Sequence, residues 1–235
     1  MPREIAGLYP GLWVSEEDEG SKNPHEEELL KQQLKRLGIN LRIYYEKVIH
    51  AKSSKALTDK FSNLLSYDLV VIVYNFIDLL AHANTDLEMI RELAGNDSAY
   101  RSLILSWFRH SQLLDFIRLL AGKDITLVVT TDHGSIRVSN PIKVIGDKRT
   151  SVNLRYKTGK NLNYNPKEVF EIKDPHSAHL PKQDISSTFI FGMGTDFFAY
   201  PNNYNYFVNY YRNTFQHGGV SMEEMMVPLV VMKPR

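Results

Sequence analysis

The stretch Leu127-Val128-Val129-Thr130-Thr131-Asp132-His133-Gly134 decides the expected fold. Its first residues favour a β-strand, because branched side chains pack well on a pleated surface. The strand then ends abruptly on an aspartate and a histidine, and Gly134 allows the chain to turn away. Open α/β sheets place their ligands at the carboxyl ends of their strands. We therefore predict a buried strand whose carboxyl end presents Asp132 and His133 to a ligand.

The bulk composition indicates a globular chain without a strong charge bias. Its 235 residues are 43% hydrophobic, which is enough for one large domain or two small ones. Lysine and arginine number 28 against 27 acidic residues, so no global field argues for duplex nucleic acid or an anionic membrane. The chain has no cysteine, which excludes disulfides and thiolate metal ligands. No apolar run approaches the roughly 20 residues that cross a bilayer, and the start lacks a signal-peptide pattern, so we expect a cytoplasmic protein without membrane insertion.

Upstream of the deciding stretch, strand and helix patterns alternate. Residues 39–50 alternate like a strand, and residues 69–74 form the continuous apolar run of a strand covered on both faces. Helices are expected from Pro24 to Leu37, over 55–65 and over most of 84–122, with a break at 95–98 where Asp97 or Ser98 would cap the second long helix. This alternation predicts an α/β three-layer sandwich, a mostly parallel sheet with helices on both faces.

After Gly134 the pattern changes to loops and short strands, which we expect over 141–182. A strand is predicted at 187–193, with residues 196–200 as its partner, and residues 227–232 read as an edge strand because they contain Pro228. The tyrosine-rich run from Tyr204 to Phe215 could stack single-stranded bases or form packing and partner contacts. Because no basic patch accompanies it, we favour packing and interface.

Three separated motifs carry side chains that suit a metal site. Asp78 follows the strand 69–74, and His82 comes four residues later, on the same face of a helical turn. Asp132 and His133 form the second motif, and His217, followed by two glycines, forms the third. Carboxylates and imidazoles without thiolates suit Zn²⁺, Mn²⁺ or Fe, and fit a catalytic site better than a structural one. Each motif alone is weak, and the three together are much more specific.

The order of these motifs resembles that of the alkaline phosphatase superfamily. It runs Asp-x₃-His, then a strand ending Asp-His-Gly, then His-Gly-Gly-Val-Ser-x-Glu-Glu followed by Val-Pro. Within that superfamily the sequence is most similar to the PglZ domain. The runs 1–5 (MPREI) and 155–162 (RYKTGKNL) resemble the C-terminal output domain of PorX-type response regulators of the type IX secretion system. The resemblance covers essentially all 235 residues.

The resemblance implies two zinc sites. Asp78, His82 and His217 would hold one zinc ion, the more complete site here, and Asp132 and His133 would hold the second. Two metals roughly 4 Å apart would clamp the attacking and leaving oxygens of a phosphoryl group.

In the family, a further acidic ligand and a nucleophilic threonine precede the sequence that matches Met1. The resemblance therefore implies that residues 1–235 are the C-terminal part of a single PglZ domain, a fragment without the first βα unit. Ser21 stands in the wrong context for a nucleophile, so we expect the chain alone to be inactive.

The implied activity of the intact parent is that of a metal-dependent phosphodiesterase or phosphatase, with a nucleotide or oligonucleotide phosphodiester as substrate. The alternative is a non-catalytic signalling module that binds a sigma factor or a cytoplasmic part of the secretion motor. Either function is compatible with a homodimer. A sugar-phosphate mutase would need specificity elements that the sequence lacks. A serine α/β hydrolase and a P-loop nucleotide binder are disfavoured because their motifs, Gly-x-Ser-x-Gly and Gly-x₄-Gly-Lys-Ser/Thr, are missing.

Three further residues are weaker candidates for substrate binding. Arg155 and Lys160 could neutralise a substrate phosphate, or could equally be surface charges on a loop. His179, together with His176, could form a further metal or substrate contact. Their spacing completes no site, so we favour a structural role for both.

Overall fold

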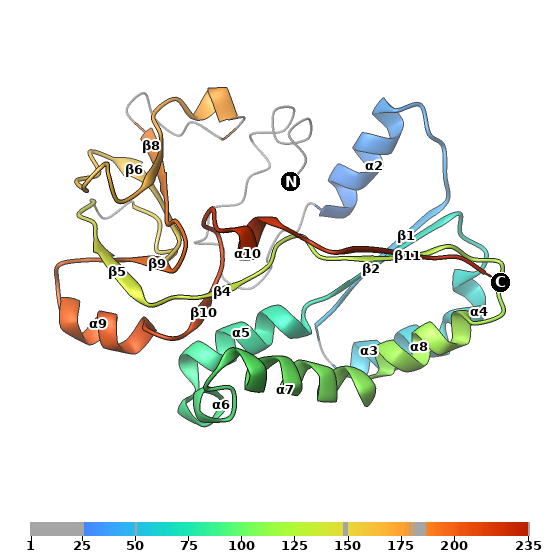
Figure 1. The fold of residues 1–235 in the computed structure, drawn as a ribbon. Helices are drawn as coiled ribbons and strands as arrows, with labels where there is room; N and C mark the ends of the chain where they lie inside the picture. Colours follow the sequence, from blue (N-terminus) through green and yellow to red (C-terminus); the bar gives the residue numbers. More distant parts are fainter. Residues whose placement is uncertain (1–25, 50, 148–149, 179, 181–186, 235) are drawn as a thin grey trace. The chain divides into compact units, whose positions relative to one another are not determined.

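The residues that precede Asp132 form strand β3 (Leu127–Thr130) in the computed structural model of the chain (Figure 1). The structure describes residues 26–49, 51–147, 150–178, 180 and 187–234. Two compact units divide these residues. Unit 1 contains Thr131–Pro228 with Glu26, and unit 2 contains the described residues of Glu27–Thr130 and Leu229–Arg235.

Unit 2 is built on a parallel strand pair covered by helices. Strands β1 (Ile43–Val48) and β2 (Leu69–Tyr74) pair in parallel, as the predicted strand-helix-strand alternation requires. Val48, Leu57, Leu64 and Phe116 form the buried cluster between these strands and the helices. The elements that supply this cluster are β1, α3 (Ala51–Asp59), α4 (Phe61–Leu64) and α8 (Gln112–Leu120).

The helical segment of unit 2 is divided by side-chain caps. The Asn96 side chain accepts a hydrogen bond from the Ala99 N–H, so Asn96 is the N-cap and not Asp97 or Ser98 as predicted. The Ser111 hydroxyl accepts from the Leu114 N–H and starts a new helix within the run that the sequence pattern treats as continuous. Asn96 thus begins α7 (Asp97–Arg109) and Ser111 begins α8, while α2 (Glu26–Arg36), α5 (Phe76–Asp86) and α6 (Glu88–Leu93) are the other helices of this part of the chain.

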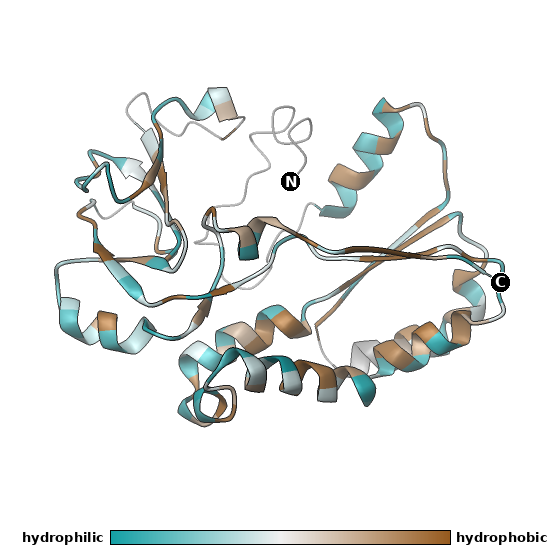
Figure 2. Ribbon diagram, viewed as in Figure 1, coloured by the Kyte–Doolittle hydropathy of each residue, from teal (hydrophilic) through white to brown (hydrophobic). Residues whose placement is uncertain are grey.

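Strand β3 differs from its prediction in burial. It pairs antiparallel with β11 (Leu229–Met232), and among the described residues these two strands form a separate two-stranded sheet. Val128 is 52% exposed and Leu229 is 68% exposed, although β11 and the first three residues of β3 are apolar (Figure 2). The expectation of a buried strand before Asp132 is therefore wrong for the described structure, because β3 pairs only with β11 among the described strands and most side chains of the pair are exposed.

Unit 1 has two apolar clusters that share one strand. Phe197 of β9 (Asp196–Ala199) packs in one cluster with Ile136 and Val138, and its neighbour Phe198 packs in the other with Ile142. Successive side chains of a strand point to opposite faces, so β9 separates the two clusters. The remaining elements are β4 (Ile136–Arg137), β5 (Asn140–Lys143), β6 (Tyr156–Lys160), β7 (Phe170–Ile172), η2 (Pro175–Ala178), β8 (Ser187–Phe191), α9 (Tyr204–Tyr211), β10 (Phe215–Gln216) and α10 (Met222–Met225).

Pairing in unit 1 differs from the prediction at β9. This strand lies parallel to β5 and not beside β8, which pairs antiparallel with β6 and β7 instead. The described residues therefore have parallel pairs at β1–β2 and β5–β9 and antiparallel ladders elsewhere. The α/β class is confirmed, while the mostly parallel three-layer sandwich stays a prediction. In the described part of the chain, every helix is too short or too polar to span a bilayer.

Candidate metal centre

The corner after β3 holds Asp132 and His133 in a defined local geometry. The Thr131 hydroxyl donates to the His133 carbonyl at 2.8 Å, and the His133 N–H donates to Asp132 Oδ1 at 3.0 Å. The Asp132 side chain is 82% exposed and lies with Oδ2 3.7 Å from His133 Nε2. An exposed carboxylate and an imidazole therefore stand side by side at this corner, as the sequence predicts.

The tautomer of His133 follows from its hydrogen bond. Nδ1 lies 3.0 Å from the Gly134 carbonyl oxygen. Because a carbonyl can only accept, Nδ1 carries the proton of the neutral ring, and the lone pair is on Nε2. This is the arrangement common to metal-binding histidines, in which the second ring nitrogen is held by a backbone carbonyl.

Strand pairing brings His217 to the same corner within unit 1. Strand β10 pairs antiparallel with β4, with Gln216 opposite Ile136. His217 directly follows β10, and the Asp132–Gly134 corner precedes β4, so this register leads both segments to the same end of the pair. The rings of His133 and His217 stack with centroids 4.1 Å apart and an interplanar angle of 15°. The family resemblance assigns these two histidines to different metal sites, and the structure shows that they are neighbours.

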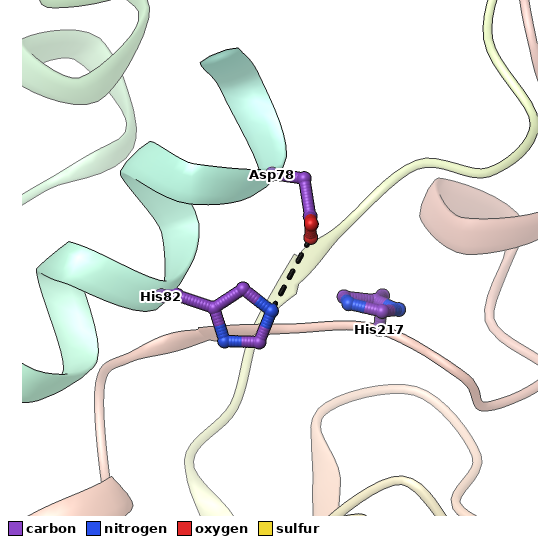
Figure 3. Close-up of side chains that lie close together, drawn as sticks. All are labelled: Asp78, His82 and His217. Atoms are coloured by element: carbon purple, nitrogen blue, oxygen red, sulfur yellow. Dashed lines mark ion pairs between the residues drawn. The ribbon is translucent and has the colours of Figure 1, made fainter. Parts of the chain in front are cut away.

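Asp78 and His82 form a pair on one helix of unit 2. Asp78 lies in the first turn of α5, directly after β2, and its Oδ1 is 3.4 Å from His82 Nε2 (Figure 3). Tyr100 of α7 is affected by this carboxylate: burial first, and then the charge of Asp78, raise the pKa of Tyr100 to about 12. The predicted four-residue spacing therefore does bring a carboxylate and an imidazole together. Figure 3 also draws His217, the third ligand implied by the resemblance.

Arg155 lies where neither sequence interpretation placed it. Its side chain is completely buried, and Nε and Nη2 donate to the two oxygens of Glu224 at 2.9 and 2.6 Å. It is therefore not a surface charge, and its guanidinium is not free to neutralise a substrate phosphate. Lys160 is half-buried on β6 and stays a prediction, whereas His179 lies outside the described residues. His176 is exposed on η2.

Glu224 ends the His-Gly-Gly-Val-Ser-x-Glu-Glu motif, but the sequence analysis assigns it no role. Its side chain is 2% exposed and accepts hydrogen bonds from Arg155, Ser221 and the Gly219 N–H. Burial alone would raise the pKa of Glu224, but these hydrogen bonds outweigh it and hold the pKa below its usual value. The pattern Ser221-x-x-Glu224, which is typical of a capping box, is the sequence signal that could have identified it.

The tyrosines of α9 divide between packing and exposure. Tyr204 and Tyr211 pack against the cluster that contains Phe197 and Val208. Tyr206 is 64% exposed and stacks on Tyr210 with centroids 6.1 Å apart. The preference for packing over base stacking is therefore confirmed for Tyr204 and Tyr211.

A family model described as the BREX system PglZ alkaline phosphatase-like domain matches residues 4–232. The chain belongs to the PglZ family. A comparison with curated proteins finds no match. As a PglZ domain the chain is alkaline phosphatase-like.

Proposed function

We propose that this PglZ domain is a zinc-dependent phosphoesterase module that acts on phosphodiesters of nucleotides or oligonucleotides. The observation that carries the proposal is the stacking of His133 and His217 beside the exposed carboxylate of Asp132. Side chains from two distant parts of the sequence thereby gather nitrogen and oxygen donors at one corner of unit 1. The family match supplies the reaction class, because the matching domain is alkaline phosphatase-like.

The donor set fits divalent metal ions. The lone pair of His133 is on Nε2, the ring nitrogen nearer to the carboxylate of Asp132, and both groups are accessible. As the resemblance implies, we assign Asp132 and His133 to one zinc ion and Asp78, His82 and His217 to the other. These oxygen and nitrogen ligands suit Zn²⁺ in an open, catalytic site. When bound, two such ions would supply positive charge for the attacking and leaving oxygens of a phosphoryl group.

The protein's own groups would bind and orient the substrate. Lys160 is the remaining candidate to neutralise a phosphate oxygen, since Arg155 is fully engaged with Glu224. We assign no nucleophile among the described residues. The setting that we propose, the output domain of a response regulator for type IX secretion, is supported only by the resemblance at residues 1–5 and 155–162. Within the second of these runs, the burial of Arg155 indicates that this residue serves the fold and not substrate contact.

The test is metal binding by the purified chain. Zinc is titrated into the metal-free protein in competition with a chromogenic chelator, for the wild type and for His133→Ala, His217→Ala and Asp78→Ala. We expect the wild type to bind zinc tightly and each variant to lose at least about tenfold in affinity, since one ligand is removed. His110→Ala, at an exposed histidine that ends α7, is the matched control and should bind like the wild type.

A second measurement addresses the reaction class. Equilibrium dialysis with adenosine monophosphate should show binding to the zinc-loaded chain and none to the metal-free chain. In the zinc titration, a wild-type zinc affinity in both His133→Ala and His217→Ala would exclude these two histidines as ligands. Tight zinc binding without any nucleotide binding would exclude the phosphoryl substrate.

A further inference from the structure

The two loops that carry the predicted metal ligands of unit 1 are joined by a single residue. The backbone carbonyl of Glu224 accepts from the Gly134 N–H at 2.9 Å, directly after His133. Its side-chain Oε1 accepts from the Gly219 N–H at 2.9 Å, two residues after His217. Glu224 therefore accepts hydrogen bonds from both loops, and the stacked histidines stand at the point where the loops meet.

Arg155 holds the Glu224 carboxylate in place. Its guanidinium donates to both oxygens of that carboxylate and also to the backbone carbonyls of Gly192 and Asp196. The Gly192 carbonyl accepts in addition from the Val220 N–H at 3.0 Å, on the loop that carries His217. A planar fork with these acceptors permits little rotation, so the carboxylate has a fixed orientation relative to β8 and β9.

Glycines permit the close approach on both sides of this pair. A Cβ at Gly134 would lie 1.9 Å from the Glu223 carbonyl oxygen. A Cβ at Gly219 would lie 2.5 Å from Arg155 Nη2. The loop after His133 therefore packs against the backbone beside Glu224, and the loop after His217 packs against Arg155. At both contacts only glycine fits without movement.

Stability alone does not account for a buried ion pair at this place. Desolvating two charges is costly, and well-packed apolar residues often serve stability equally well. Unit 1 already has two apolar clusters, yet Glu224 of this pair accepts hydrogen bonds from the two loops that carry the stacked histidines. Metal ligands need to be held within narrow limits by the residues behind them, and such residues affect metal affinity strongly.

We propose that Arg155 and Glu224 are positioning residues that hold His133 and His217 in the stacked, metal-ready arrangement. Neither side chain would touch metal or substrate. The metal-affinity part of this inference rests on the proposed function, whereas the arrangement of the two rings in the metal-free protein does not.

The experiment compares Glu224→Gln and Arg155→Lys with the wild type. Glu224→Gln keeps the shape of the side chain and removes its charge, and Arg155→Lys keeps the charge and removes the fork. Val208→Ala is the matched control, because Val208 is buried in unit 1 at 6% exposure and packs in the apolar cluster that contains Phe197. Only variants that circular dichroism shows to be folded are measured. If Glu224→Gln does not fold, Arg155→Lys alone tests the positioning role.

Two readouts are measured on each variant. In the metal-free chain, the mutual ring-current shifts of the His133 and His217 imidazole protons should be present in the wild type and Val208→Ala, and reduced in Glu224→Gln and Arg155→Lys. The zinc dissociation constant should rise about 10- to 100-fold in the same two variants and stay unchanged in the control.

The outcomes separate the two proposals. Folded Glu224→Gln and Arg155→Lys with wild-type ring-current shifts would overturn the positioning role, whatever the metal affinity. Reduced shifts in these variants, combined with a wild type that binds no zinc, would support the positioning role and reject the proposed function. If Val208→Ala loses as much ring-current shift and zinc affinity as the other two variants, the effect is one of general stability. That result would also overturn the inference.

Discussion

Each of the two units contains an arginine that binds both oxygens of a carboxylate, with closely similar chemistry and opposite surroundings. In unit 1 Arg155 binds both oxygens of Glu224, with side-chain exposures of 0% and 2%. In unit 2 Arg42 binds both oxygens of Asp68, through Nε at 3.1 Å and Nη2 at 3.0 Å, with side-chain exposures of 68% and 39%. The fork geometry alone therefore does not decide what an ion pair contributes.

The difference lies in what else each carboxylate binds. Glu224 also accepts from Gly219 and Ser221, so it connects segments that carry the candidate site. Asp68 accepts from the N–H and the side chain of Arg42, and this contact joins the beginnings of β1 and β2. Water can replace Arg42 at Asp68, whereas a buried carboxylate without its arginine has no such substitute.

The largest expected effect is that of breaking the buried pair from one side. Arg155→Ala should lower the free energy of unfolding by about 3–5 kcal/mol, because it leaves the buried charge of Glu224 uncompensated. Urea denaturation followed by circular dichroism measures the loss. Arg42→Ala is the control. A loss in Arg155→Ala no larger than that in Arg42→Ala would show that burial does not set the two pairs apart.

The second effect tests the close packing behind the buried pair. Gly134→Ala should cost about 1–3 kcal/mol, towards the upper end, because its Cβ would meet the Glu223 carbonyl oxygen at 1.9 Å. Gly38→Ala in unit 2 is the comparison: Gly38 has φ +69° but open space around it, so only the left-handed backbone costs energy, about 1 kcal/mol. Equal urea midpoints for the two variants would show that the loop at Gly134 moves to accommodate the methyl group.

The fold could be predicted from the sequence where the signal is local, and not where it depends on contacts between distant segments. Strands β1, β2 and β8 lie within predicted ranges, because runs of branched and aromatic residues are a local signal. The pairing of β9 with β5 could not be predicted in this way, since a partner is chosen by packing between distant segments. The caps at Asn96 and Ser111 depend on which of several polar residues reaches the backbone, which composition alone does not decide.

The residues of the candidate site also differ in whether a local sequence pattern identifies them. The four-residue spacing places Asp78 and His82 on one turn, and the strand-end pattern identifies Asp132 and His133. Arg155 was misassigned because nothing around it in the sequence marks a buried cation, and its partner is 69 positions away. Long-range ion pairs of this kind have no local pattern, even where the partner, Glu224, belongs to a recognisable Ser-x-x-Glu motif.

A smaller effect is expected from pH. The pKa of Glu224 is lower in the folded chain than in the unfolded chain, so its ionised form stabilises the fold. This contribution is complete above the unfolded pKa of about 4.3 and is lost as pH falls through the lower folded pKa. Urea denaturation between pH 7 and pH 3 should therefore show a steeper loss in the wild type than in Glu224→Gln. Parallel curves for the two proteins would contradict a lowered pKa.

The smallest effect should come from the exposed pair. The pKa of Asp68 is lowered to about 2, chiefly by the hydrogen bond from the Arg42 side chain, so its ionised form also favours the fold above its unfolded pKa. Because both side chains are exposed, water and salt compete for their charges, and Asp68→Asn should shift the urea midpoint little. What shift there is should vanish in about 1 M NaCl, whereas the loss in Arg155→Ala should persist, since salt screens a buried pair much less. A salt-independent loss in Asp68→Asn would show that the contact joining β1 and β2 acts through backbone order and not through charge.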